Sequence, residues 1–439
     1  MTGSNGKEQT MEALVAAHRE HLFPWVKPYY EEPLALVEGE GVRVRDAGGN
    51  TYLDLFAGIL TTSIGHCHPA VVESVRDQVG RLGHTSTLYV TENQVEVARR
   101  LAEITPDGLA RACFTNSGTE AVESAVMAAR IATGRSEIVA LRHAYSGRSL
   151  LATGITAHAA WRPLPASIPG IAHARSPYPY RCPLGPECDE ACTDFFIDDL
   201  VETIETTTSG RPAALIIEPV QGVGGFIVPP SGYLRRAAEV IRGYGGLLIA
   251  DEVQTGFGRT GDRWFAVEHE EVTPDVMIMA KGIANGFPVG ATVATEEVAG
   301  AWTAASISTY GGNPVSMAAA AATLDVMVRE DVPARASARG ARLRAGLEQL
   351  RDAHEWIGDV RGMGLMQALE LVEDRESRAP APGRARRLLE AARAEGLLIG
   401  LGGLRGNVIR FGPSMLISEA EIDEGLERLA RACRRAEEA

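Results

Sequence analysis

Lys281 is the residue whose type and setting point most directly to covalent chemistry. Among the 43 basic residues of the 439-residue chain only Lys7, Lys27 and Lys281 are lysines, and only Lys281 lies in the body of the sequence. It follows the apolar run Val276–Met279 and precedes a Gly-rich turn. A primary amine forms a Schiff base with a carbonyl compound and a guanidinium does not, so a buried Lys281 is a candidate nucleophile. The alternative is a strand-end lysine that reaches solvent.

Asp251 follows the apolar run Leu247–Ala250, thirty positions before Lys281. Ligand crevices open at the carboxyl ends of parallel strands, where both side chains are expected. Alone, a strand-end aspartate is commonly a helix cap or turn former. Together with Lys281 it indicates a heterocycle held between an amine and a carboxylate, such as a pyridine ring with a protonated nitrogen.

A phosphate site is predicted at Ser117, Gly118 and Thr119, which lie between a strand-like run and a helical pattern. Free N–H groups at a helix start bind anions, and Gly118 lets an anion approach the backbone closely. The alternative is a simple capping box formed by Ser117 and Glu120.

Three further side chains are candidates for binding a flat ring or a carboxylate. Tyr145 follows the next predicted strand, and its ring has the shape to cover the face of a flat cofactor. Arg148, nearby, and Arg410, at the end of a later strand, are candidates to bind a substrate carboxylate through paired N–H donors. Each arginine alone is a weak indication, because the chain has many.

Cys182, Cys188 and Cys192 are close together in RCPLGPECDEAC. Zinc sites use cysteine, but this segment has neither a CxxC pair nor a histidine at the usual spacing. We therefore expect a loop of reduced thiols and no metal site.

These residues require a sheet whose strand ends meet at one edge. Between residues 95 and 300, short apolar runs alternate with helical patterns, which is typical of a mainly parallel α/β sheet. A hairpin is predicted over 36–55, and a Pro-rich polar loop over 375–387. The expected divisions are an N-terminal segment (1–55) joining the small domain, a large domain (56–315) and a small α+β domain (316–439). The predicted strands are 111–115, 138–141, 213–217, 247–250, 276–279 and 291–294.

The net charge of −14 and a pI near 5.3 favour small-molecule ligands over nucleic acid or an anionic membrane. The sequence has no apolar run of about 20 residues and no secretory leader pattern, so we expect a cytoplasmic protein.

Five motifs together resemble the class III pyridoxal phosphate (PLP) aminotransferases, in the family's order and spacing. They are NSGTEAVESA, IIEPVQGVGG, ADEVQTGFGRTG, MAKGIANGFPVGA and STYGGNP. The resemblance covers nearly the whole chain. It implies PLP as cofactor and fold type I, the aspartate aminotransferase-like α/β fold.

The resemblance also assigns roles to residues. Lys281 matches the Schiff-base lysine, and Asp251 the partner of the pyridine nitrogen. The other cofactor residues implied are Gly118 and Thr119 at the phosphate, Val253 and Tyr145 on the ring faces, Gln254 near the ring hydroxyl, and Glu218 beneath the cofactor. Thr309 matches the residue that reaches the neighbouring subunit's phosphate, which implies a homodimer, or a dimer of dimers, with shared sites.

Val223 departs from the ornithine and 4-aminobutyrate enzymes, which have at this position a glutamate paired with the arginine matched by Arg410. Arg410 is therefore expected to remain unpaired with a glutamate at position 223 and able to bind a substrate carboxylate. Val223, the cysteine-bearing insert and LIGLGGLRGNVIR are similar to the second type of alanine:glyoxylate aminotransferase. Arg148 instead resembles the ornithine-like pattern.

The expected reaction moves an amino group from an amino acid or ω-amino compound to an oxo acid such as pyruvate or glyoxylate. A lyase, decarboxylase or epimerase of the same fold, and a 4-aminobutyrate-type aminotransferase, are alternatives. So is a catalytically silent α/β binding protein. A dinucleotide oxidoreductase is disfavoured because no GxGxxG opens the first helix of the sheet.

Overall fold

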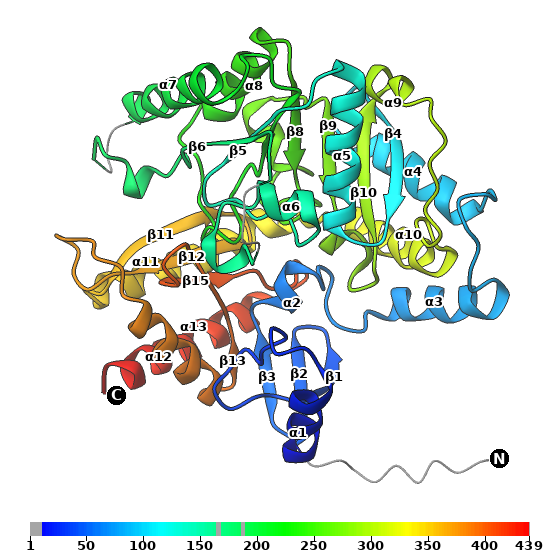
Figure 1. Ribbon diagram of the computed structural model, residues 1–439. Coiled ribbons are helices and arrows are strands. Elements are labelled where there is room, and N and C mark those ends of the chain that lie inside the picture. The colour runs from blue at the N-terminus through cyan, green and yellow to red at the C-terminus, as the bar shows by residue number, and fades with distance from the viewer. Residues whose placement is uncertain (1–10, 164–167, 186–188, 439) are drawn as a thin grey trace.

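The fold of the computed structural model is built around a seven-stranded sheet in the order β4-β10-β9-β8-β7-β5-β6 (Figure 1). The structure describes residues 11–163, 168–185 and 189–438. Strands β6, β5, β7, β8 and β9 are parallel, and β10 is antiparallel to both of its neighbours. The six predicted strands are confirmed within two residues at their ends, and β6 was not predicted. The strands are β4 (Leu109–Thr115), β5 (Ile138–Leu141), β6 (Ile171–Ala174), β7 (Ala214–Ile217), β8 (Leu247–Asp251), β9 (Val276–Met279) and β10 (Gly290–Thr295).

Helices cover both faces of this sheet, which explains why its central strands β5, β7, β8 and β9 are continuous apolar runs. Side chains alternate along β8: Ile249 packs in the cluster that includes the buried face of α5, whereas Leu248 and Ala250 belong to the cluster on the other face. The helices of this region are α3 (Pro69–Arg81), α4 (Glu92–Ile104), α5 (Gly118–Thr133), α6 (Leu150–Ile155), α7 (Asp189–Thr207), α8 (Tyr233–Gly243), α9 (Glu296–Ala301) and α10 (Pro314–Arg329).

The N-terminal part forms a second sheet, at the bottom of Figure 1. After α1 (Met11–His21), strands β1 (Leu36–Glu40), β2 (Arg43–Asp46) and β3 (Thr51–Asp54) form an antiparallel meander. The predicted hairpin is present as β2–β3, and the prediction missed the break before β2. Strand β3 also pairs in parallel with β13 (Leu397–Leu398), so the two ends of the chain share this sheet.

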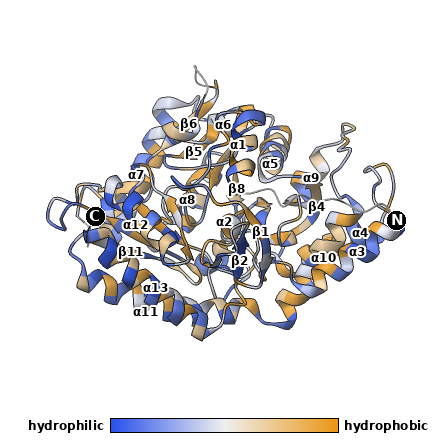
Figure 2. Ribbon diagram, turned by 90° about the horizontal axis from the view of Figure 1, so that it is seen from below, coloured by the Kyte–Doolittle hydropathy of each residue, from blue (hydrophilic) through white to orange (hydrophobic). Residues whose placement is uncertain are grey.

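The third sheet has the order β11-β12-β15-β14 and is covered by α11 and α12, and α13 packs against both of these helices. These helices carry both hydrophilic and hydrophobic residues (Figure 2). The loop prediction over 375–387 was wrong in its second half, because α12 begins at Pro382, and proline is well suited to the first turn of a helix. The elements are α11 (Val332–Ala353), β11 (Ile357–Met363), β12 (Met366–Leu371), α12 (Pro382–Ala394), β14 (Gly400–Gly402), β15 (Val408–Phe411) and α13 (Glu419–Glu438).

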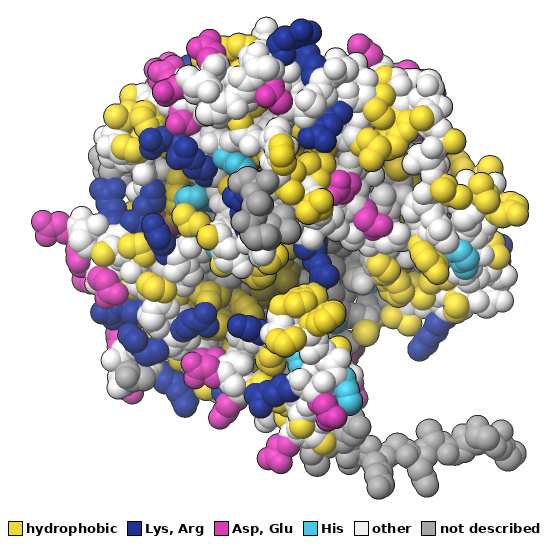
Figure 3. Space-filling model, in the orientation of Figure 1, with side chains coloured by type: hydrophobic (Ala, Val, Ile, Leu, Met, Phe, Trp, Pro, Cys, Tyr) yellow, Lys and Arg dark blue, Asp and Glu magenta, His cyan; other side chains and the backbone are white. Residues whose placement is uncertain are grey.

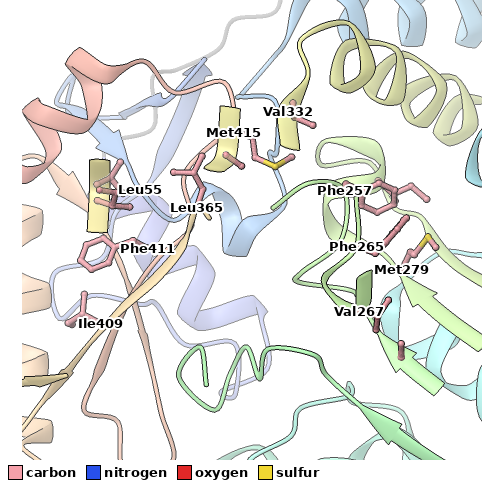
Figure 4. Close-up of a cluster of buried hydrophobic side chains, with 14 of the residues drawn as sticks. Leu55, Phe257, Phe265, Val267, Met279, Val332, Leu365, Ile409, Phe411 and Met415 are labelled. Atoms are coloured by element: carbon pink, nitrogen blue, oxygen red, sulfur yellow. The ribbon is translucent and has the colours of Figure 1, made fainter. Parts of the chain in front are cut away.

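One hydrophobic cluster runs from the large sheet into the other two. Figure 4 shows Phe257, Phe265 and Met279 on the side of the large sheet and Leu365 and Phe411 on the side of the third sheet. The core therefore fixes the strand ends of the large sheet relative to β12 and β15. The expected division of the chain at residues 55 and 315 stays a prediction.

Of the three clustered cysteines, Cys182 and Cys192 are buried thiols, and Cys188 lies outside the described residues. Within the described ranges, no group of three histidine, cysteine or acidic side chains is arranged to hold a metal ion. In the same ranges no helix has the length and apolarity needed to cross a membrane.

Candidate active site

A pocket of about 250 Å³ opens at one edge of the large sheet. Its polar side chains come from the segments that follow β4, β5, β7, β8 and β9, whose carboxyl ends meet there. Ten of the predicted site residues line it. They are Ser117, Gly118, Thr119, Tyr145, Arg148, Glu218, Asp251, Val253, Gln254 and Lys281.

Lys281 begins a short 3₁₀ turn, Lys281–Ala284, directly beyond β9. Its φ of +41° is in the left-handed region, which lysine rarely adopts. Such backbone strain is concentrated at functional sites. Burial lowers the pKa of the Lys281 amine, while the carboxylates of Asp251 and Glu218 oppose that shift. The amine is therefore more easily deprotonated than an exposed lysine.

Two buried carboxyl groups share the pocket with this amine. Asp251 is the last residue of β8, and its Oδ1 accepts a hydrogen bond from the Val253 N–H at 3.1 Å. Glu218 accepts from Tyr145 N–H at 3.0 Å and from Gly222 N–H at 2.8 Å, so it joins the loops after β5 and β7. Burial raises the pKa of both carboxyl groups, and the Asp251 charge raises that of Glu218 further. A protonated ring nitrogen beside Asp251 would relieve this unfavourable burial.

The N-terminus of α5 faces the same pocket. Half of the capping box is present: Ser117 Oγ accepts from the Glu120 N–H at 3.4 Å, whereas the Glu120 carboxylate accepts from the N–H of Asn116, one residue before the N-cap, at 3.0 Å. Thr119 Oγ1 accepts from the N–H groups of Arg148 and Ser149 at 3.2 and 3.0 Å. The first turn of α5 and the loop after β5 therefore form one unit, with N–H groups left for an anion.

The residues present fit PLP. Gln254 Oε1 is buried and has no hydrogen-bond partner in the described structure, which leaves it for a hydroxyl donor on a ligand. The N-terminus of α5 is suited to bind the phosphate of PLP. The Asp251 carboxylate is suited to the ring nitrogen, and the Lys281 amine to the aldehyde. Val253 and Tyr145, on different loops, line the space between them.

Arg410 lies beside this pocket, on β15, and is 5% exposed. Its Nη1 donates to the Gly222 carbonyl at 3.2 Å and its Nη2 to the Leu401 carbonyl at 2.9 Å, while Nε has no partner. The guanidinium also lies over the rings of Phe56 and Phe226. In the described residues no carboxylate forms an ion pair with it, so its charge is open to a bound anion.

Arg148 and Thr309 are placed differently. The Arg148 guanidinium carbon lies 4.4 Å from the ring centroid of Trp25, an N-terminal residue that the sequence reasoning missed. Thr309 is exposed and does not line the pocket of its own chain. Gly147 was also missed, although its place beside Tyr145 in YSGRS could have indicated it.

Comparisons with known proteins agree with this geometry. The family model "Aminotransferase class-III" matches residues 26–433. Alanine–glyoxylate aminotransferase 2 homolog 2, mitochondrial, of Arabidopsis thaliana is 40% identical over 413 residues, covering 94% of this chain and 85% of the relative. The acetylornithine aminotransferase of Methanopyrus kandleri is 41% identical over 407 residues, covering 92% and 96%.

The crystal structure of an (S)-enantioselective ω-transaminase from Thermomicrobium roseum superposes with a TM-score of 0.90. It is 36% identical, and the match covers 97% of this chain and 99% of that one. The fold is therefore fold type I of the PLP enzymes. The chain belongs to the class III aminotransferases, enzymes that use pyridoxal phosphate to transfer an amino group to an oxo acid.

Proposed function

We propose that the amino donor is a small amino acid with a free carboxylate, such as alanine, and that the acceptor is glyoxylate or pyruvate. The observation that carries the proposal is Arg410, a buried cation held by main-chain carbonyls and paired with no carboxylate in the described structure. Val223 follows Gly222, whose carbonyl binds Arg410, and offers no charge to neutralise it. A planar guanidinium binds a carboxylate through paired hydrogen bonds. The named Arabidopsis relative supports the same pair of substrates.

Different residues of the pocket have different roles in the reaction. PLP, when bound, supplies an electron-withdrawing ring that accommodates the electron pair left on the donor carbon when its proton is removed. The Lys281 amine would take that proton and later release it, and burial, which lowers the pKa of this amine, favours the neutral form that accepts a proton. Asp251 would hold the ring nitrogen, and Ser117, Gly118 and Thr119 would hold the phosphate.

Arg410 orients the donor in this scheme. Its guanidinium is bonded to the Gly222 carbonyl in the loop after β7, so it would hold the donor carboxylate on the β15 side of the pocket. A donor held at its carboxylate presents the amine and the carbon-bound proton to Lys281. The rings of Phe56 and Phe226 exclude water from the guanidinium and strengthen its attraction for an anion.

An ω-amino compound is the second candidate donor. It is favoured by the similarity to the Thermomicrobium roseum ω-transaminase and to acetylornithine aminotransferases. Arg148 also lines the pocket, although its guanidinium is stacked on Trp25. A terminal amine would then react while its distant carboxylate lay nearer the pocket mouth.

We also infer that the enzyme is a homodimer, or a dimer of dimers, with shared sites. Exposed apolar side chains precede α4 and lie in the segment before α10: Leu88, Tyr89, Val90, Ile307 and Tyr310. Figure 3 shows hydrophobic side chains gathered on the side of the molecule where α4 lies in Figure 1. A second copy on this face would bury them and bring its Thr309 toward the phosphate end of the pocket. We also propose that this protein is cytoplasmic, whereas the named Arabidopsis relative is mitochondrial.

A half-reaction tests the proposal. The PLP-loaded enzyme is mixed with one donor alone, and pyridoxamine phosphate and oxo acid are quantified. L-alanine is expected to give one equivalent of each per site, with a higher kcat/KM than 4-aminobutyrate. Decarboxylation, elimination or racemisation without pyridoxamine phosphate would overturn the reaction class. Faster conversion of 4-aminobutyrate would favour the second candidate.

A further inference from the structure

Arg259 is the largest fully buried side chain of the described structure, with an exposed fraction of 1%. It lies in the loop that follows β8 and begins just after Asp251. No carboxylate in the described ranges forms a salt bridge with it. A buried cation without a counter-charge is costly unless its N–H groups are well bound. Nη2 of Arg259 has no hydrogen-bond partner in the described structure, so the bonds made by Nη1 and by the main chain are the ones that indicate what the residue does.

These hydrogen bonds tie one residue to two separate segments of the third sheet. Nη1 of Arg259 donates to the carbonyl of Leu365 at 3.3 Å and to the carbonyl of Pro413. The main-chain carbonyl of Arg259 accepts from the Leu365 N–H at 3.0 Å. Leu365 immediately precedes β12, and Pro413 follows β15 by two residues.

The two strands held in this way are the pair that carries Arg410. In the β12–β15 ladder Arg410 lies opposite Ala368, and Phe411 lies opposite Gln367. Leu365 and Pro413 are at the same end of this ladder, so Arg259 binds both strands at the end next to Arg410. Charged donors give stronger hydrogen bonds than neutral ones, which suits a single side chain that must fix two strands.

The Arg259 loop and the segment before β12 are closely packed, with little room for either to move. Gly364, with φ of +51°, lies so near the Arg259 loop that an added Cβ would come within 2.6 Å of the Arg259 carbonyl oxygen. Leu365 and the nearby Met415 lie within the buried cluster of Figure 4. A change in the Arg259 side chain would therefore be transmitted to the strand ends.

We propose that Arg259 is a positioning residue that fixes Arg410 relative to Asp251 and so sets the affinity for the donor carboxylate. Arg259 is not among the residues lining the cofactor pocket, and it acts through β12 and β15. The inference rests on the role of Arg410 in the proposed function. Burial lowers the pKa of Arg259 to about 9, so the side chain remains charged at neutral pH.

The test compares Arg259→Met, which keeps the volume and loses the donors, with Arg259→Lys, which keeps the charge. With L-alanine as donor, Arg259→Met is expected to raise KM about tenfold while kcat stays within about twofold, because Arg410 is displaced and Lys281 is not. Arg259→Lys should recover part of this loss, and the visible absorbance of the bound cofactor should be unchanged in both. If Arg259→Met does not fold, the KM of Arg259→Lys alone decides, and a wild-type KM overturns the proposal.

Leu347→Ala is the matched control, since Leu347 is fully buried in α11 and outside the pocket. It should lower the melting temperature without raising KM. A merely structural role for Arg259 would give the same pattern, with a lower melting temperature and a wild-type KM, and would overturn the proposal.

A double-mutant cycle with Arg410→Gln separates this inference from the proposed function. If Arg259 acts through Arg410, Arg259→Met should change kcat/KM by less than about twofold in the Arg410→Gln background. An equal loss in both backgrounds would overturn the positioning role. If Arg410→Gln itself leaves KM unchanged while Arg259→Met raises it, the role of Arg410 fails and Arg259 must act elsewhere.

Discussion

Nη1 of Arg410 donates a hydrogen bond to the carbonyl oxygen of Gly222 at 3.2 Å, which ties the β15 arginine to the loop after β7. The next residue, Val223, accepts through its own carbonyl from the Gly403 N–H at 2.9 Å. The same loop begins at Glu218, whose carboxylate holds the Tyr145 and Gly222 N–H groups. A charged side chain at position 223 would therefore lie close enough to Arg410 to change the net charge of this anion site.

Replacement of Val223 by glutamate is expected to close this anion site. The new carboxylate would pair with the Arg410 guanidinium and compete with the donor carboxylate. KM for L-alanine should rise at least about tenfold, equivalent to about 1.4 kcal/mol. Steady-state kinetics measure the effect, and Val223→Gln, similar in shape and uncharged, is the control. A glutamate variant with the KM of the glutamine variant would show that charge at position 223 does not reach Arg410.

Loss of Lys281 should abolish both turnover and the visible absorbance of the cofactor bound through the amine. We expect Lys281→Ala to lower kcat at least about a thousandfold, because both the covalent attachment and the proton carrier are removed. Lys27→Ala is the control and should retain both properties. Borohydride treatment followed by peptide mapping should place the cofactor on the Lys281 peptide of the wild type. Recovery of the label on the Lys27 peptide would contradict the assignment.

Much of this site was predictable from the sequence because parallel strands impose a simple rule. The central strands β5, β7, β8 and β9 are short apolar runs buried on both faces, and polar side chains that follow several such runs must meet at one edge. Asp251, Lys281 and Ser117 could be placed by that rule. Glu218, Gln254 and Val253 depended on the family resemblance.

Contacts between segments distant in the sequence could not be predicted in this way. The Arg148–Trp25 stack and the tie from Arg259 to Leu365 and Pro413 depend on how the sheets pack against one another. The start of α12 within a proline-rich segment was missed for a local reason. Pro382 indicated an irregular loop. In the first turn of a helix, however, the N–H groups have no partner within the helix, so a proline there costs no hydrogen bond.

Gly147 is expected to be necessary for a tight cofactor site. Its φ is +126°, and an added Cβ would lie 2.4 Å from Thr119 Oγ1, the atom that joins α5 to this loop. Gly147→Ala should therefore weaken PLP binding at least about tenfold. Gly134→Ala is the control, since it also places alanine at a positive φ, +65°, where an added Cβ has no neighbour within 4 Å. Equal PLP dissociation constants for the two variants would show that strain alone, and not the Thr119 contact, matters.

The shared site can be tested by subunit complementation. Lys281→Ala lacks the reacting amine, and Thr309→Asp would bring a repelling charge toward the partner's phosphate. Each variant alone should be inactive or nearly so. After the two are mixed, unfolded and refolded together, a heterodimer would combine the intact Lys281 of one subunit with the intact Thr309 of the other at one of its two sites. Activity well above the sum of the separate variants is expected, and a mixture no better than that sum would contradict shared sites.

Glu252 should make the stability of the enzyme depend on pH. Its carboxyl is 1% exposed, and burial raises its pKa to about 7, although the Thr255 hydroxyl and the Val267 N–H donate to it. Between its ordinary value of 4.5 and about 7, the folded state holds a proton that the unfolded state has released. The stabilising contribution is therefore complete below about pH 4.5 and is lost as the pH rises through about 7.

We therefore expect unfolding free energy to fall by at most about 1.4 kcal/mol per pH unit across this range on account of Glu252 alone. Glu252→Gln cannot titrate, so its stability should fall less steeply between pH 5 and pH 7.5 when unfolding midpoints in urea are compared. Tyr233→Phe is the control, because it removes a buried hydroxyl that has no hydrogen-bond partner in the described structure. Its slope should match that of the wild type. If the glutamine variant has the wild-type slope too, Glu252 is ionised in the folded protein over this whole range, and its bonds to Thr255 and Val267 outweigh the cost of burial.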